Sequence, residues 1–427
     1  MKLLLGQTLG FAADPFATDP LQSISHHSHG GVLIEDGKIL AIDNGQKLRT
    51  AYPQATIHDY GQHLITAGFI DAHVHYPQTA MINSWGKRLI DWLNDYTFPE
   101  ENRFGNLPYA ETIAERYLDL VLAHGTTSIC SFCTSHPESV DALFGAASKR
   151  DMRVFAGKTC MDRNAPETLQ DTAQSAYDQS AALLKKWHNI GRNHYVITPR
   201  FAPTSSPEQL EALGALWQEN PDCLMQTHLS EQTEEVAWVK SLYPTARDYL
   251  DSYEMFGLLG KGGLYGHSIW LEERERNRIR ESEAALIHCP TSNTALGSGL
   301  FPLAALKEEG QKIGLATDTG GGSSFSMLRT MAAAYEIAQL KGSVLHPFQL
   351  YWLATQGSAQ TLLQDHRIGN LHNGMDADLV VLNLASTPAI AQRNDQAKDL
   401  AESLFPTIMM GDDRAIKSVW VAGKEML

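Results

Sequence analysis

Two histidines separated by one residue, His73 and His75, have the spacing in this chain that most directly suggests chemistry. They end the apolar run Ala67–His75. In a β-strand, residues i and i+2 face the same side, so both imidazoles can point at one metal ion. A pair of this kind is by itself more often two ordinary polar residues. The interpretation therefore depends on whether the chain offers further ligands.

Three further polar residues, His228, His267 and Asp318, each follow an apolar, strand-like run. Two have simpler explanations: His228 could be a hydrogen-bonded core histidine, and Asp318 could cap a helix before Gly320–Ser323. These explanations give no reason for three imidazoles and a carboxylate each to lie at the end of a strand. Taken in this order, the four pieces predict a hydrolytic metal site.

Zinc favours imidazole nitrogen and carboxylate oxygen, and a catalytic zinc keeps one position for water. We expect His73, His75, His228 and Asp318 to hold such an ion, which lowers the pKa of its water toward about 7. Asp318 could also accept a proton from the attacking water.

Two nearby residues suit the proton transfers of such a reaction. Glu231 lies three residues beyond His228 and can face the water without binding the metal, which suits a proton shuttle to a ring nitrogen of the substrate. The alternative for Glu231 is a surface or helix-capping carboxylate before the acidic segment Gln232–Glu235. His267 could hold the water or stabilise the charge that develops on it.

The elements that must position these residues alternate between strand-like and helix-like segments, which indicates parallel strands joined by crossover helices. Eight candidate strands match the number in a closed (β/α)8 barrel, and every ligand candidate falls at the C-terminal end of its strand, where barrel enzymes build their sites. The candidate strands are Leu64–His75, Thr126–Phe132, Arg153–Thr159, Tyr195–Ala202, Leu224–Glu231, Gly263–Ile269, Ala284–Pro290 and Lys312–Asp318.

The sequence patterns at both ends of the chain are typical of short β-strands. Near the N-terminus, Asp36-Gly37 separates two alternating apolar runs, which is a good hairpin signal. Near the C-terminus, Ala377–Leu382 and Ser418–Gly423 read as strands. The fold class we expect is α/β: a TIM-like barrel over residues 66–371, with a small β-sandwich domain formed by residues 1–65 and 372–427.

Composition excludes several classes of protein. The chain has 427 residues with 34 basic and 49 acidic side chains, a net charge of −15, which argues against a nucleic-acid or anionic-membrane partner. No apolar stretch approaches the roughly 20 residues of a membrane helix. Five cysteines form no disulfide framework, so we expect a reducing cytoplasm. Cys130 and Cys133 form a CxxC without a second metal-binding pair and are expected to be buried thiols.

Longer motifs support a resemblance that covers nearly the whole chain: it resembles the amidohydrolase superfamily and, within it, the guanine deaminase family. Ala67 departs from the superfamily's usual Pro-Gly, with little chemical consequence. Besides the four metal motifs, the residues that carry the resemblance are His75–Gln78, Trp92–Glu100, Met161–Asn164, Pro199–Ala202, Thr227–Glu231, His288–Asn293, Asp318–Ser323 and Gly374–Val380.

The resemblance implies zinc-dependent hydrolysis of guanine to xanthine and ammonia, usually by a homodimer. We expect one metal ion per subunit, and the sequence leaves iron open beside zinc. It implies metal binding by His73, His75, His228 and Asp318, and catalysis by Glu231, His267 and Asp318. It also implies purine contacts from Gln78, Arg200 and Phe201, with His228 beside the substrate. We expect the flat ring to meet apolar faces, and Trp85, close behind Gln78, to cover the site. The neighbouring stripe of Leu89, Trp92, Leu93 and Tyr96 predicts a helix whose apolar face serves packing.

Other readings remain open. The chain could be another mononuclear amidohydrolase acting on a different purine, a pyrimidine or a triazine, or an inactive barrel that serves as a scaffold. His136-Pro137-Glu138 lacks the Pro-Cys-x-x-Cys of the other zinc deaminase class. Lys158 ends the third strand rather than the fourth, where two-metal relatives carry a carbamylated lysine, so one metal is expected. His26, His27 and His29 are expected to be solvated in a loop.

Overall fold

Eight parallel strands form a nearly closed barrel in the computed structural model, which describes residues 1–85 and 89–427. The sheet runs in the order β13-β12-β11-β10-β9-β7-β6-β5, with β8 (Thr159–Cys160) paired to β9. The barrel strands are β5 (Phe69–His75), β6 (Thr126–Phe132), β7 (Arg153–Gly157), β9 (Asn193–Pro199), β10 (Leu224–Leu229), β11 (Gly263–His267), β12 (Ala285–His288) and β13 (Lys312–Leu315).

Strands from both ends of the chain join in a separate seven-stranded sheet of order β16-β15-β14-β4-β1-β2-β3. Asp36 and Gly37 have φ of 48° and 77°, the left-handed values that a two-residue hairpin turn needs, and this confirms the predicted hairpin between β2 and β3. The strands are β1 (Lys2–Phe11), β2 (Ile24–Glu35), β3 (Lys38–Asn44), β4 (Thr56–Ala67), β14 (Leu379–Leu382), β15 (Ile416–Val421) and β16 (Lys424–Glu425).

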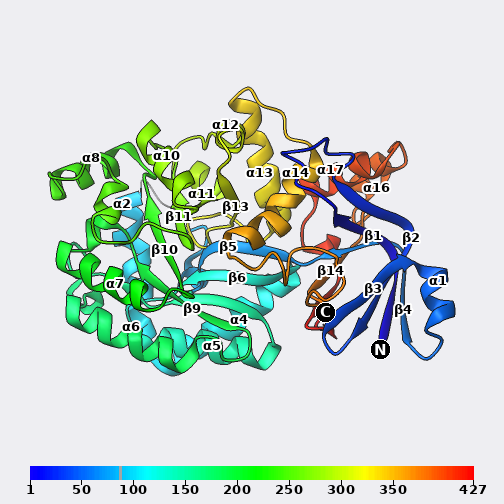
Figure 1. The fold of residues 1–427 in the computed structure, drawn as a ribbon, viewed down its shortest axis with the longest axis horizontal. Coiled ribbons are helices and arrows are strands. Elements are labelled where there is room, and N and C mark those ends of the chain that lie inside the picture. Colours follow the sequence, from blue (N-terminus) through cyan, green and yellow to red (C-terminus); the bar gives the residue numbers. More distant parts are fainter. Residues whose placement is uncertain (86–88) are drawn as a thin grey trace. The chain divides into compact units, whose positions relative to one another are not determined.

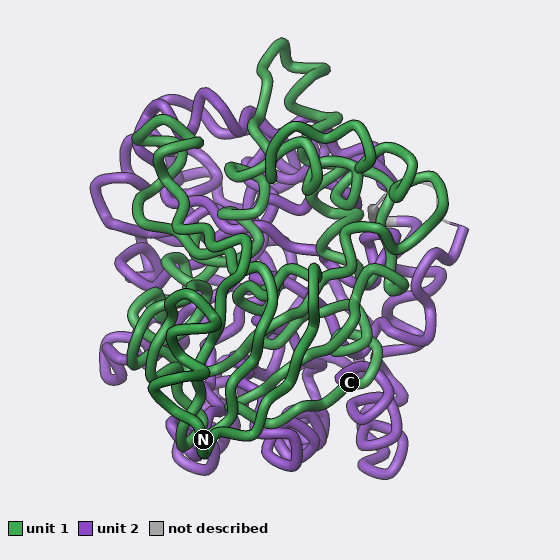
Figure 2. The backbone as a smooth tube through the Cα atoms, turned by 90° about the vertical axis from the view of Figure 1, so that its right-hand side faces the viewer, with its two compact units in different colours: residues 1–71, 119–128, 325–427 green, residues 72–118, 129–324 purple. Residues whose placement is uncertain are grey.

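The chain divides into two compact units, which Figure 2 shows in different colours. One comprises residues 1–71, 119–128 and 325–427, and its core packs around the fully buried Trp420. The other comprises residues 72–118 and 129–324 and contains the C-terminal ends of all eight barrel strands. The predicted domain boundaries at residues 66 and 371 stay predictions.

Helices cover the outer side of the barrel strands in the second unit (Figure 1), where α5 packs on β7, and α6 and α7 pack on β9. The helices of this unit are α2 (Leu89–Trp92), α3 (Phe98–Glu101), α5 (Pro137–Arg150), α6 (Ala173–Trp187), α7 (Pro207–Glu219), α8 (Thr233–Leu242), α9 (Asp251–Glu254), α10 (Glu273–Glu281), α11 (Pro290–Ala295) and α12 (Leu303–Glu308). A π-helical turn, Leu93–Thr97, connects α2 to α3. The side chain of Leu89, part of the predicted stripe, lies outside the described residues.

In the first unit, α13 packs against α17 and α14. Its helices are α1 (Gly45–Ala51), α13 (Met327–Leu340), α14 (Pro347–Trp352), α15 (Ser358–Thr361), α16 (Pro388–Asn394) and α17 (Leu400–Met410), while α4 (Leu107–Ala123) has residues in both units. Within the described part of the chain, none of the helices combines the length and the apolar character needed to cross a membrane.

The predicted first barrel strand, Leu64–His75, is wrong because the chain forms two strands there. β4 ends at Ala67 in the terminal sheet, and β5 starts at Phe69 in the barrel. At Gly68, between them, a Cβ atom would lie 2.3 Å from the Thr127 hydroxyl oxygen, so only glycine fits the close approach. His26, His27 and His29 lie in β2 rather than in the predicted loop, and their side chains are exposed or half-buried.

Several barrel strands end sooner than predicted, and residues just beyond them leave the extended conformation. Ser230 follows β10 with φ of 50°, and Asp318 follows β13 with φ of 50°. His267, the last residue of β11, has φ of 66°. These left-handed residues turn the chain sharply at the C-terminal mouth of the barrel. Polar residues of different strands are thereby turned toward one another.

Candidate active site

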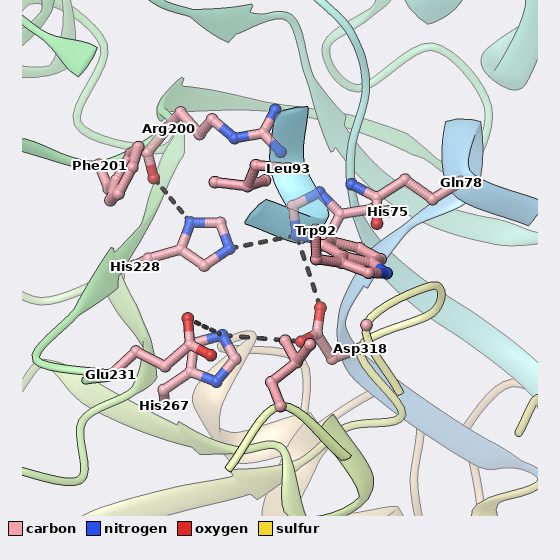
Figure 3. A pocket seen from close by; sticks show the side chains of 12 residues that line it. His75, Gln78, Trp92, Leu93, Arg200, Phe201, His228, Glu231, His267 and Asp318 are labelled. Carbon is pink, nitrogen blue, oxygen red and sulfur yellow. Dashed lines mark hydrogen bonds and ion pairs between the residues drawn. The ribbon is translucent and has the colours of Figure 1, made fainter. Parts of the chain in front are cut away.

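Three imidazoles and one carboxylate converge at the C-terminal ends of β5 and β10 and just after β13. His75 Nε2 lies 3.1 Å from His228 Nε2, and Asp318 Oδ1 lies 3.5 Å from both His73 Nε2 and His75 Nε2. Figure 3 shows His75, His228 and Asp318 pointing toward a common point. The structure therefore brings together all four predicted metal ligands.

Three distances within this donor set suit a single zinc-sized cation. Ligand atoms that each lie about 2.1 Å from one zinc in a tetrahedral arrangement are roughly 3.4 Å apart, close to the three observed separations. His73 Nε2 is buried and has no hydrogen-bond partner among the described residues. A buried ring nitrogen of this kind calls for a partner, and a metal ion is the partner that the surrounding donors suit.

Hydrogen bonds hold two of the histidine rings in defined orientations. His228 Nδ1 lies 2.7 Å from the backbone oxygen of Arg200, and this oxygen can only accept. Nδ1 therefore carries the proton and Nε2 keeps its lone pair toward the cluster. His267 Nδ1 lies 2.8 Å from the amide oxygen of Asn293, which lies in the helix α11 that follows β12. Its Nε2 consequently faces Glu231 and Asp318.

The charges of the cluster suit cation binding. Burial lowers the pKa of His75 and of His228 well below 6.5, so both rings are neutral at neutral pH. Burial alone would raise the pKa of Asp318, but a hydrogen bond with His73 and the positive charge of His267 lower it to about 2. Neutral imidazoles and an ionised carboxylate are the forms that bind metal.

Glu231 faces this cluster without belonging to it. Its Oε1 accepts a hydrogen bond of 2.8 Å from the Ser298 hydroxyl, and its Oε2 lies 3.6 Å from His267 Nε2. Burial is the main reason that the pKa of Glu231 is raised above its ordinary value. For His267, burial acts to lower the pKa, but the negative charges of Glu231 and Asp318 outweigh it and raise that pKa. A carboxylate with a raised pKa beside a water-activating cluster can both take up and release a proton.

A pocket opens beside the cluster, and three predicted purine-contacting residues line it. Gln78 follows β5 and is 1% exposed, and Arg200 and Phe201 follow β9 and are 3% and 5% exposed. The pocket therefore presents amide and guanidinium donors and an aromatic ring (Figure 3). The described lining residues are His75, Gln78, Trp92, Leu93, Arg200, Phe201, His228, Glu231, His267, Leu296, Asp318 and Gly321.

The loop after β8 holds the segment that carries Arg200 and Phe201. Asp162 accepts a hydrogen bond of 2.7 Å from the backbone N–H of Ser206. Arg163 and Asn164 donate to the backbone oxygens of Ala202 and Pro203 at 3.1 and 2.7 Å. The motif Met161–Asn164 thus fixes the path of the chain beyond Phe201.

The two tryptophans of this region differ in their surroundings. Trp85 is 84% exposed and is not among the described lining residues, so its role at the substrate stays a prediction. Trp92 and Leu93 pack in a buried hydrophobic cluster with Phe201, as predicted, and they also line the pocket. The helical periodicity of these residues predicted the packing but could not show that the same residues border a pocket.

Other residues that reasoning from sequence did not assign also take part. Ser298 and Asn293 contact Glu231 and His267, as described above. Glu101 is fully buried and accepts hydrogen bonds from both Gln78 and Arg200. Cys289 directly follows β12, and its Sγ lies within 4.8 Å of ligand atoms of His73, His267 and Asp318. Its place just after a strand end was the only available signal.

Four other residues that could suggest metal chemistry are accounted for by burial, an ion pair or ring stacking. Lys158 is fully buried, and its Nζ lies 2.6 Å from Asp171 Oδ2, so its charge is already paired. Cys130 and Cys133 are buried thiols, as predicted, and burial raises the pKa of Cys133 well above 9. His288 is fully buried and stacks on Phe301 with the ring centroids 4.4 Å apart.

Comparison with known proteins agrees with this geometry. The model of the amidohydrolase family matches residues 64–426, and residues 30–55 also match a bacterial imidazolonepropionase-like composite domain. Guanine deaminase of Escherichia coli K12 is 44% identical over 396 residues, which cover 92% of this chain and 90% of that protein.

Solved structures give the same result. The structure of E. coli guanine deaminase superimposes with a TM-score of 0.98 at 41% identity, covering 100% of this chain and 99% of that one. Guanine deaminase of C. acetobutylicum, solved with guanine bound in its active site, gives a TM-score of 0.91 at 29% identity, with both chains fully covered. The barrel, the metal-ligand cluster and the family match together show that this chain belongs to the amidohydrolase family.

Proposed function

We propose that this protein catalyses the hydrolytic deamination of guanine to xanthine and ammonia. The observation that carries the proposal is the pocket in which Arg200 and Gln78, as hydrogen-bond donors, lie beside the His/Asp cluster and Glu231. The similarity to guanine deaminases over nearly the whole chain supports guanine as the substrate.

His73, His75, His228 and Asp318 would hold the single metal ion, and the nitrogen and oxygen donors favour zinc. The amidohydrolase family is generally metal-dependent, in keeping with this donor set. When bound, the ion supplies Lewis-acid activation of the water that attacks the substrate.

The chain's own residues move the protons. Glu231 takes a proton from the attacking water and delivers it to N3 of guanine as the oxygen adds to C2. His267, held by Asn293, faces the same point and stabilises the charge that develops on the oxygen. Asp318 accepts the second proton of the water and passes it to the C2 amine, which leaves as ammonia. One water is consumed, and one oxygen replaces one amine.

The remaining lining residues bind and orient the purine. Arg200 and Gln78 donate to acceptors on the six-membered ring of guanine, and the rings of Phe201 and Trp92 offer apolar faces to it. An adenine in this pocket would bring its amine against these donors. A site built to hydrogen-bond one group discriminates strongly against a substrate that lacks it.

We also propose that the protein forms a homodimer and acts in the cytoplasm. Five buried free cysteines fit a reducing compartment, and the net charge of −15 fits a small-molecule substrate rather than nucleic acid.

Incubating the purified, metal-loaded protein with guanine, adenine, cytosine and a triazine, while following ammonia release, tests the activity. We expect ammonia from guanine alone, with xanthine as the product. Chelation should abolish the reaction, and added Zn²⁺ should restore it. Ammonia release from another member of the panel but not from guanine would reject the proposed substrate.

A further inference from the structure

We infer that Glu101, which lies outside the metal cluster, makes one edge of the purine pocket purely hydrogen-bond donating and thereby selects a 6-oxopurine over a 6-aminopurine. The inference rests on the proposed function and assigns a positioning residue to it. Glu101 ends helix α3, just before the chain turns into α4 through the segment Asn102–Asn106.

Glu101 connects the two polar residues of the purine pocket. Its Oε1 accepts a hydrogen bond of 2.9 Å from the Gln78 amide nitrogen, and its Oε2 accepts one of 2.7 Å from Arg200 Nη1. Glu101 is fully buried, and Gln78 and Arg200 are 1% and 3% exposed. Gln78 follows β5 and Arg200 follows β9, so one carboxylate aligns side chains from two different strands.

The contacts of Gln78 determine which of its groups is left for a ligand. An ionised carboxylate can only accept hydrogen bonds, so the Gln78 amide must turn its nitrogen toward Glu101. On the other side, the backbone N–H of Gly320 donates to Gln78 Oε1 at 3.3 Å, which requires an acceptor there. Both neighbours demand the same orientation. The amide therefore has its second N–H to offer to the pocket and cannot turn its oxygen there.

Arg200 also makes this edge of the pocket hydrogen-bond donating, because a guanidinium carries only donors. Glu101 balances its charge in a buried setting, and the ring of Phe98 lies beneath it at 5.5 Å. The edge formed by Gln78 and Arg200 thus consists of N–H groups. A carbonyl at C6 of a purine accepts from such an edge, whereas an amine at C6 would oppose N–H with N–H and leave the pocket donors unpaired.

Glu101→Gln tests this inference with two substrates, guanine and 2,6-diaminopurine. Both carry the leaving amine at C2, and they differ in the group at C6 and in the ring proton that goes with it. In the variant, the new amide can present its oxygen to only one of the two donors, so Gln78 or Arg200 loses its fixed orientation. We expect KM for guanine to rise by about 10-fold with kcat within about 3-fold, and the preference for guanine over 2,6-diaminopurine to narrow by about 10-fold, with zinc content unchanged.

Glu100→Gln is the matched control. Glu100 is the neighbouring carboxylate and also binds an arginine, but its partners are Arg103, at 2.9 Å, and the hydroxyl of Tyr109. Neither Arg103 nor Tyr109 lines the pocket. This variant should keep the guanine preference of the unmodified protein.

The outcomes separate the inference from the proposed function. If the unmodified protein releases no ammonia from guanine, the proposed function fails. If it does, and Glu101→Gln retains KM and the preference, the inference alone is overturned. An equal loss for both substrates, with loss of zinc, would likewise overturn it, because Glu101 would then act only in folding. If Glu101→Gln does not fold, Glu101→Asp replaces it: the charge is kept, but the shorter side chain reaches only one donor. We expect the same narrowing, and an unchanged preference would refute the inference.

Discussion

The Ser298 hydroxyl donates a hydrogen bond of 2.8 Å to Oε1 of Glu231, from a loop 67 residues further along the chain. Both side chains are buried. The bond leaves Oε2, the other carboxylate oxygen, facing His267. Ser298 therefore holds the Glu231 carboxylate in an orientation with one oxygen toward the cluster.

Ser298→Ala should lower kcat for guanine by roughly 5- to 10-fold, because one net hydrogen bond is worth about 1 kcal/mol and this one orients the proton shuttle. KM and metal content should stay near those of the unmodified protein. Steady-state kinetics and metal analysis measure both. A variant with unchanged kcat would show that Glu231 needs no such support.

Glu231→Gln should keep the metal but lose at least roughly 10²-fold in kcat, the usual contribution of a general acid–base group. Glu234→Gln is a matched control, because Glu234 is exposed and lies three residues further along. It should retain full turnover. Near-normal ammonia release by the Glu231 variant would remove its assigned role.

Arg200→Ala should reduce kcat/KM for guanine by roughly 10- to 100-fold without loss of zinc, because a hydrogen bond to a charged donor contributes about 1.5–3 kcal/mol. It also leaves Glu101 buried without its cation, so the melting temperature should fall as well. Arg103→Ala serves as the control, since the Arg103 side chain is 55% exposed and pairs with Glu100. An unchanged specificity constant for Arg200→Ala would contradict the pocket assignment.

Glu275→Gln should flatten part of the pH dependence of stability. Burial raises the pKa of Glu275 from 4.5 to about 7, although N–H donors from Glu272 and Leu250 partly offset it. A carboxyl whose pKa is raised on folding binds more protons in the folded state, so its contribution is full below pH 4.5 and is lost as pH rises through about 7. The loss amounts to about 3 kcal/mol.

Urea unfolding at pH 5 and pH 8 measures this effect. The unmodified protein should lose more stability between these two pH values than the Glu275→Gln variant does. Equal losses in the two proteins would show that Glu275 does not titrate in this range.

Much of the site follows from local sequence patterns. The i, i+2 spacing of His73 and His75 and the position of His228, His267 and Asp318 at strand ends were sufficient to predict a shared cluster at the barrel mouth. Two physical rules make this possible: side chains alternate along a strand, and the C-terminal ends of parallel strands meet.

Residues that act through long-range contacts could not be found in this way. Glu101 and Arg200 are 99 residues apart, and no periodicity relates them. Gly68 shows the same limit for the fold: the apolar run Leu64–His75 is continuous in sequence, and the close approach of Thr127 to the residue between the two strands is not visible in it. Trp85 is exposed and Trp92 is buried because of how the chain packs around them, and the sequence near them does not reveal this difference.

The metal-ligand cluster lies where the first barrel strand, β5, approaches the segment that follows the last strand, β13. The backbone N–H of Asp318 donates to the oxygen of His73 at 3.0 Å, and the N–H of His75 donates to the oxygen of Thr319. An ion bound by His73, His75 and Asp318 would therefore link the first barrel strand to the segment that follows the last strand. Loading the cation should then protect the amides of both edges from hydrogen exchange, far more than it protects strands such as β7 that contribute no ligand.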